Sequence, residues 1–162
     1  VQRLEQAVER IERLAPPEPA TAARGTPSVG DVTDAFEVTA AGRDWLAHSG
    51  PALLLQVETV ANEAVGAVRW GPASIDPSVL VHRGGPLTTA IAASAPSKVA
   101  VIGRGIDERH PAVGLAAELR AQNRHVAVVE CGWPRGTADI TTFGSAPVIA
   151  AALVALLTGQ TG

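Results

Sequence analysis

Two six-residue stretches, KVAVIG at 98–103 and HVAVVE at 125–130, decide the fold of this chain. In both of them apolar residues occupy the two faces of a strand, and a glycine-containing loop follows. Strands that are apolar on both faces belong to parallel sheets buried between layers of helices. The stretches ALLLQVE at 52–58 and VLVH at 79–82 have the same character and extend the predicted sheet.

Helix signals separate these strands. Proline at the first turn begins predicted helices at 86–93 and 111–122, and Asn123 supplies the stop of the second. Since strands and helices alternate, the sequence predicts an α/β domain: a mostly parallel five- or six-stranded sheet with helices on both faces, a three-layer sandwich.

The end of the chain is also readable. Residues 138–143 (ADITTF) predict a last strand, and Ser145 predicts the N-cap of a buried helix at 146–157. Gly159 is expected to end that helix. Near the start, residues 35–39 (AFEVT) alternate as an edge strand does, with a short helix through 31–40 as the alternative.

The N-terminal part has a different composition. Apolar residues at helical spacing predict an amphipathic helix over 2–14, and the Pro- and Gly-containing residues 16–30 predict a linker or surface wrap. We therefore expect a linking helix and linker at 1–34 and the sandwich domain at 35–162. Because the sequence contains no methionine, we also expect it to be a piece of a longer protein.

Composition excludes several classes of function. The 162 residues carry a net charge of −3, and the 13 basic residues form no stripe, so nucleic acid is not an expected partner. The longest apolar run, 146–157, is too short for a membrane span, and no signal peptide is visible, so localisation stays unassigned. The single cysteine excludes an internal disulfide and a multi-cysteine zinc site.

Ligands of such sheets bind beyond the carboxyl ends of the strands, which here means the loops at 59–66, 82–85, 103–108 and 130–136. The loop ECGWPRG at 130–136 concentrates polar and aromatic groups. In the alternative interpretation, Trp133 packs against the edge of a layer of the sandwich, and the charged side chains of Arg104 and Asp107 are solvated. The residues predicted to face a substrate or an interface are Arg104, Asp107, Glu130, Trp133, Arg135 and Glu63.

No catalytic residue is assigned from the sequence. Cys131 with His82 shows no nucleophile–base spacing, so an inert thiol is the favoured interpretation. No GxSxG or HExxH motif is present, and nothing pairs Glu58, Glu63 and Glu130. GRGID at 103–107 lacks the third glycine of a dinucleotide fingerprint. We predict no metal and no cofactor.

The stretches at 42–71 and 125–159, with the Gly-Trp-Pro loop at 132–134 and DITTFG at 139–144, resemble the C-terminal α/β sandwich domain of actinobacterial family-three glycoside hydrolases of the β-N-acetylhexosaminidase-like branch. Residues 2–14 resemble the last helix of the preceding barrel. The resemblance implies a catalytic barrel as partner, with carbohydrate at the domain interface. It also implies that the nucleophile lies on the barrel, which is not in this chain.

Two other classes of function stay open. One is a free-standing Rossmann-like or flavodoxin-like module that binds a small anion or nucleotide near 103–107. The other is a structural interaction domain, because Trp and Arg dominate interface hot spots. Its anchors would be Trp70, Arg104, Trp133 and Arg135.

Overall fold

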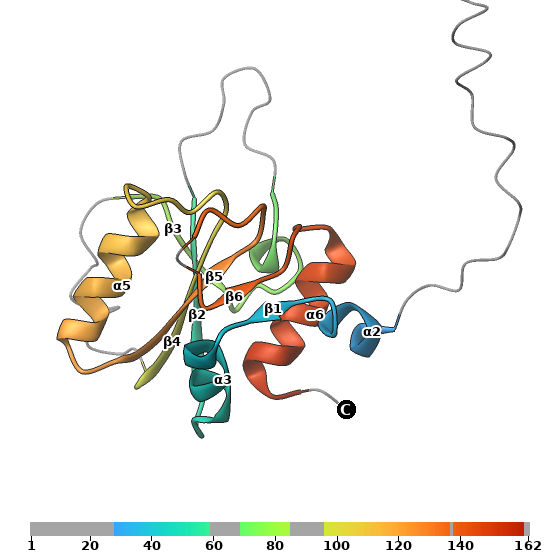
Figure 1. Ribbon diagram of the computed structural model, residues 1–162, viewed down its shortest axis with the longest axis horizontal. Helices are drawn as coiled ribbons and strands as arrows, with labels where there is room; N and C mark the ends of the chain where they lie inside the picture. Colours follow the sequence, from blue (N-terminus) through green and yellow to red (C-terminus); the bar gives the residue numbers. More distant parts are fainter. Residues whose placement is uncertain (1–27, 59–68, 85–95, 137, 161–162) are drawn as a thin grey trace, which may run out of the picture.

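The computed structural model describes residues 28–58, 69–84, 96–136 and 138–160 (Figure 1). The helix predicted over 2–14, most of the predicted linker, the loop at 59–66 and the helix predicted at 86–93 lie outside these residues.

The described residues form a six-stranded sheet in the order β1-β6-β5-β4-β2-β3. All neighbouring strands are parallel except β1, which pairs antiparallel with β6 at one edge. The mostly parallel α/β sandwich predicted from the sequence is confirmed. The strands are β1 (Glu37–Val38), β2 (Ala52–Val57), β3 (Leu80–His82), β4 (Lys98–Gly103), β5 (His125–Glu130) and β6 (Ile140–Thr141).

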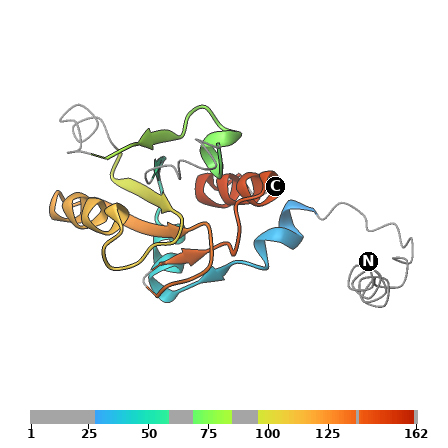
Figure 2. The same cartoon turned by 90° about the horizontal axis from the view of Figure 1, so that it is seen from above.

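Helices cover both faces of the sheet (Figures 1 and 2). One face carries α5, and the opposite face carries α6 and the shorter α3, while α2 lies beside α6 (Figure 1). The bounds are α2 (Val29–Thr33), α3 (Ala40–Ala47), α5 (Pro111–Ala121) and α6 (Pro147–Thr158), with a 3₁₀ turn η1 (Pro72–Ser74).

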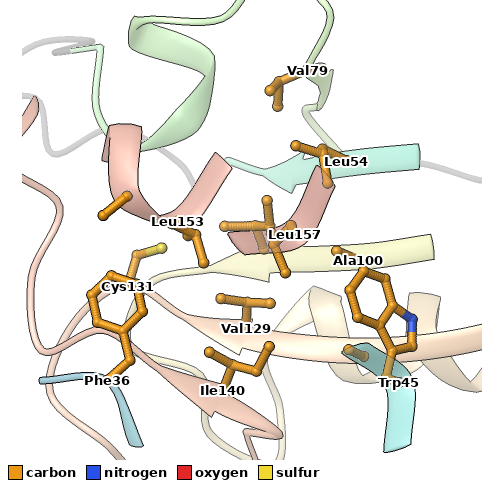
Figure 3. Close-up of a cluster of buried hydrophobic side chains, with 13 residues drawn as sticks. Phe36, Trp45, Leu54, Val79, Ala100, Val129, Cys131, Ile140, Leu153 and Leu157 are labelled. Carbon is orange, nitrogen blue, oxygen red and sulfur yellow. The ribbon is translucent and has the colours of Figure 1, made fainter. Parts of the chain in front are cut away.

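Side chains alternate between two core clusters because successive residues of a strand point to opposite faces. On β4, Val99 and Val101 face α5, whereas Ala100 and Ile102 face α6. The α6 side also buries Trp45 of α3, shown with its neighbours in Figure 3. This cluster contains few aromatic rings, as the 3% aromatic composition requires.

Two local expectations need correction, and one helix was missed. Residues 29–33 were assigned to the linker, but they form α2, with Ser28 and Asp31 as a capping box, and Val32 packs on the core. The N-cap of α6 is Ala146 rather than Ser145, and its side chain makes no capping hydrogen bond. Helix α3 was not predicted.

Other boundaries match the sequence signals. Asn123 has a φ of 60° just after α5, and Gly159 ends α6 at a φ of 72°, both in the left-handed region. The edge strand expected at 35–39 is β1. Asparagine and glycine adopt the left-handed backbone conformation more readily than other residues.

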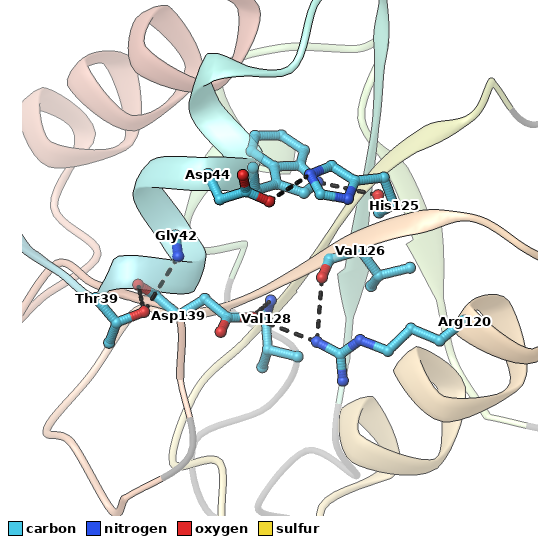
Figure 4. Close-up of polar contacts among 9 residues, drawn as sticks. Thr39, Gly42, Asp44, Arg120, His125, Val126, Val128 and Asp139 are labelled. Carbon is cyan, nitrogen blue, oxygen red and sulfur yellow. Dashed lines mark hydrogen bonds and ion pairs between the residues drawn. The ribbon is translucent and has the colours of Figure 1, made fainter.

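A set of polar contacts ties α3 and α5 to the sheet at the end opposite the strand carboxyl termini (Figure 4). Asp139 Oδ2 accepts hydrogen bonds from the backbone N–H of Val128 at 2.8 Å and from Arg120 at 3.4 Å. Gly42 allows α3 to approach closely, because an added Cβ there would lie 2.4 Å from the Asp139 carbonyl oxygen. These contacts serve the fold.

The strand order places a topological switch point between β2 and β4. The chain runs outward from β2 to β3 on one side, and from β4 through β5 to β6 on the other. In doubly wound sheets the connections then leave a crevice beyond the carboxyl ends of the two central strands. The residues that follow Val57 and Gly103 are therefore the first place to look for a site.

Candidate functional site

Glu130 was predicted to face a substrate or partner, and the structure corrects this. Its side chain is only 1% exposed at the end of β5. One carboxylate oxygen accepts a hydrogen bond from the backbone N–H of Gly105 at 2.8 Å, and the other accepts one from Ile106 at 2.6 Å. Gly105 has a φ of 71°, which lets two successive N–H groups converge on the same anion. The carboxylate therefore acts as an internal anion that fastens the β4–α5 loop to β5.

Arg104 lies at the switch point, exposed, in the same loop. Its guanidinium carbon is 5.2 Å from the centre of the Trp70 ring, a cation–π distance. The other end of its side chain lies against Gly132, where an added Cβ would be 3.0 Å from Arg104 Cγ. Arg104 thus connects the loop after β5 to the segment after β2.

Trp133 is 77% exposed, so the interpretation in which it plugs a layer edge is wrong. Its ring meets Phe143 edge-on, with centroids 6.0 Å apart and an angle of 72°. Phe143 is 42% exposed and has a φ of 57°, a conformation that costs an aromatic residue roughly 1–3 kcal/mol. Strain of this kind gathers at functional surfaces, and the two rings form one aromatic platform on the rim.

The segment that carries Phe143 is held by hydrogen bonds. The Thr142 hydroxyl donates to the Gly144 carbonyl at 2.6 Å, and the Thr142 backbone N–H donates to the Glu130 carbonyl at 3.0 Å. Gly132, next to Trp133, has no room for a side chain, since an added Cβ would lie 2.9 Å from Glu130 Oε1. Glu130 therefore supports both segments of the aromatic platform, its backbone carbonyl through Thr142 and its carboxylate through the close packing of Gly132.

Of the three remaining candidate residues, two are exposed and one lies outside the described part of the chain. Asp107 is exposed, and its carboxylate accepts a hydrogen bond from the Arg109 backbone N–H at 2.9 Å, as a turn residue does. Arg135 is exposed on the loop after β5, near the aromatic platform in sequence. Glu63 lies outside the described residues.

Cys131 is a core residue. It is 1% exposed and belongs to the α6-side cluster, into which its thiol points in Figure 3. Burial raises the pKa of the Cys131 thiol from 9.0 to about 12, with Thr142 acting in the opposite direction. His82 lies on β3, separated from β5 by β2 and β4, so it is roughly 14 Å away across the sheet. The burial of this thiol, which the sequence favoured, is confirmed.

His110 caps α5 just beyond this rim. Its Nδ1 accepts a hydrogen bond from the backbone N–H of Ala112 at 3.1 Å, and its Nε2 is buried without a hydrogen-bond partner among the described residues. Burial lowers the pKa of His110 below 6.5, although the negative charges of Glu130 and Asp107 oppose this. The imidazole is thus a neutral cap near neutral pH.

Ionisable groups at the opposite end of the sheet also serve the structure. Lys98 Nζ donates to the His48 carbonyl at 2.8 Å and lies 4.2 Å from the centre of the Trp45 ring. It thereby caps the end of α3, where the helix dipole favours a cation. His125 Nε2 is 3.7 Å from Asp44 Oδ2 (Figure 4), a distance that leaves the ion pair weak.

The residues that sequence reasoning missed are those around Gln56. The glutamine side chain is fully buried and holds the segment after β2, because it donates to the Trp70 carbonyl at 3.1 Å and accepts from the Ala73 N–H at 3.0 Å. A polar residue inside the otherwise apolar run ALLLQVE was the available signal. A pocket of about 230 Å³ lies beside it.

Neither a candidate metal site nor a helix able to span a membrane is found among the described residues. Within the described ranges, no group of three or more His, Cys, Asp and Glu side chains is placed to hold a metal ion. None of the helices in those ranges combines the length and apolar character that crossing a membrane requires.

Comparison of the chain with models of known protein families, with curated proteins and with solved structures finds no match. The rim presents an exposed aromatic platform, a cation–π bridge and a polar pocket, while its buried carboxylate and thiol are committed to the fold.

Proposed function

We propose that this chain is the accessory C-terminal domain of a retaining glycoside hydrolase of the β-N-acetylglucosaminidase type. It acts by docking its rim on a catalytic barrel that is not part of this chain. The resemblance of the Gly-Trp-Pro loop and its flanking sequence to this family supports the assignment. The α/β sandwich fold agrees with it. In this account the domain shapes the sugar site from outside and supplies no nucleophile.

The single observation that carries the proposal is the aromatic platform of Trp133 and Phe143. A tryptophan that is 77% exposed, held by a strained neighbour and a rigid loop, adds little to stability on its own. Tryptophan is the residue most enriched in interface hot spots, where it is buried by the partner. The platform therefore fits a docking surface better than a solvent-facing loop.

The chemistry of the rim agrees with an accessory role. Glycosidases need two carboxyl groups that are free to act on the substrate, about 5–10 Å apart. Glu130 has both oxygens occupied by backbone N–H groups, and Glu58 pairs with Arg83 at 3.0 Å. Two of the three carboxylates considered from the sequence are thus already engaged.

The test is hydrolysis of an aryl N-acetyl-β-glucosaminide. The chain alone should show no turnover above the uncatalysed rate, whereas the parent protein with its barrel should be active. In a pull-down with that barrel, Trp133→Ala should weaken association at least tenfold, and Arg109→Gln, a change at another exposed loop residue, should not. Turnover by the chain alone would sink the accessory assignment.

The nucleotide-binding alternative loses its expected position. A phosphate near 103–107 would need the backbone N–H groups of Gly105 and Ile106, and the Glu130 carboxylate already accepts both. At the start of α5, His110 takes the N–H of Ala112. The backbone N–H groups that a phosphate at 103–107 would use are therefore already engaged within the chain.

A further inference from the structure

The pocket beyond β2 is separate from the aromatic platform. It is bounded by the ends of β2 and β3 and by the segment through η1 that joins them. Its volume of about 230 Å³ is below the 300–1,000 Å³ typical of drug-sized ligands, so it suits a smaller molecule. The residues that line it are Gln56, Glu58, Arg69, Trp70, Ala73, Asp76, Pro77, Val79, Val81 and Arg83.

The pocket is built rather than incidental. The two Gln56 hydrogen bonds fix Trp70 and Ala73 on one side. Gly71 has a φ of 58°, and an added Cβ there would lie 3.1 Å from Gln56 Oε1, so the turn between them depends on glycine. The wall is therefore preformed, which lowers the ordering cost of binding.

The charged side chains around the pocket differ in whether they have hydrogen-bond partners. Glu58 accepts from Arg83 Nε at 3.0 Å, and Asp76 accepts from the Ser78 N–H at 2.8 Å. The exposed Arg69 guanidinium has no hydrogen bond or ion pair within the described part of the chain. Arg104 adds a further guanidinium above the Trp70 ring. The lining thus carries two carboxylates and two guanidinium groups, and among the described residues Arg69 is the charged lining residue without a hydrogen-bond or ion-pair partner.

We propose that this pocket binds a small organic ligand that carries an oxyanion, a carboxylate or a phosphate, with Arg69 as its principal contact. A guanidinium presents two parallel N–H groups that match such an anion. Arg83 and Trp70 line the same pocket, and the Trp70 ring supplies an apolar wall for the carbon part of the ligand. This inference is independent of docking on a barrel, because it concerns a different part of the rim.

The experiment is a titration of the complete 162-residue chain followed by ¹H–¹⁵N NMR. The probes are glucuronate, glucose 6-phosphate and glucose, which share one sugar ring and differ in the charged group. We expect saturable shifts of the Trp70 indole N–H and the Ala73 and Val81 amides with one or both anionic probes, and none with glucose. A response to one anion only identifies the group that the pocket takes.

Three variants sharpen the test. Arg69→Gln should weaken binding about tenfold or more, since a charge-assisted contact is lost. Val81→Phe, which fills the pocket from β3, should abolish binding, and Arg109→Gln should leave it unchanged. Arg69 is exposed, so its variant remains folded even if Val81→Phe does not. Equal shifts with glucose, no saturable shift with either anion, or unchanged binding by Arg69→Gln would overturn the proposal.

Discussion

The backbone N–H of Ile106 donates a 2.6 Å hydrogen bond to the carboxylate of Glu130, from one strand-end loop to the neighbouring strand. With the 2.8 Å bond from Gly105, it places a protein carboxylate where related sheet architectures place a ligand phosphate. The rim is therefore rigid next to the switch point, and the surfaces left for partners lie on either side of it.

Replacing Glu130 should destabilise the domain. In Glu130→Gln an amide N–H₂ faces one of the two backbone donors, so we expect a loss of about 2 kcal/mol or more in the free energy of unfolding. Denaturant unfolding followed by circular dichroism measures this. Glu118→Gln, on the exposed side of α5, is the matched control and should change stability by less than about 0.5 kcal/mol. A similar small change for Glu130→Gln would contradict the fastening role.

Cys131 should be chemically silent in the native domain. Because the thiol is buried and its pKa is raised to about 12, almost no thiolate exists at pH 8. An aromatic disulfide reagent should react within minutes with the urea-unfolded chain and far more slowly with the native one. Equal rates in the two states would show that the thiol is accessible and would reopen it as a nucleophile.

Stability should fall at mildly acidic pH through His110. Burial lowers the pKa of the folded imidazole below 6.5, so as pH falls through 6.5 the unfolded chain binds the proton first. The free energy of unfolding should therefore decrease from pH 7 towards pH 5. His110→Asn keeps a capping oxygen for the Ala112 N–H and removes the titration, and its unfolding free energy should depend less on pH. Parallel pH profiles of the two proteins would count against this assignment.

Removing the exposed tryptophan should affect association rather than folding. Trp133→Ala leaves the core intact and should shift the free energy of unfolding by less than about 1 kcal/mol. Trp45→Ala is the contrasting variant, since Trp45 is 1% exposed and should cost about 3–5 kcal/mol. Thermal and denaturant melts compare them. A Trp133→Ala loss as large as that of Trp45→Ala would assign Trp133 to the core.

The sheet could be predicted because the signal for each of its main strands lies within one short stretch of sequence. The runs at 98–103 and 125–130 are apolar on both faces, and such runs have few alternatives to a buried strand. Helix α3 escaped prediction because AAGRDWLA is short, contains glycine and depends on Trp45 packing beneath it. Tertiary contacts stabilise this helix, and the periodicity of the sequence does not reveal them.

The candidate site was predicted less completely. Glu130 was predicted to face a substrate or an interface, although strand alternation puts it on the same side as Val126 and Val128, beneath the loop at 105–106. The pocket beyond β2 depends on Gln56 joining segments 14 and 17 residues away, which no spacing pattern reveals. Trp133 is exposed, as a residue that faces a partner must be, but its exposure depends on how tightly Gly132 packs in the loop, which no sequence pattern reveals.

The docking proposed for this chain is tested by its affinity for the catalytic barrel of the proposed parent glycosidase, measured by calorimetry with the wild type and with Trp133→Ala. We expect a saturable one-to-one complex that the substitution weakens at least tenfold, while the chain alone leaves an aryl N-acetyl-β-glucosaminide intact. Absence of a complex, or a complex that Trp133→Ala does not change, would contradict it.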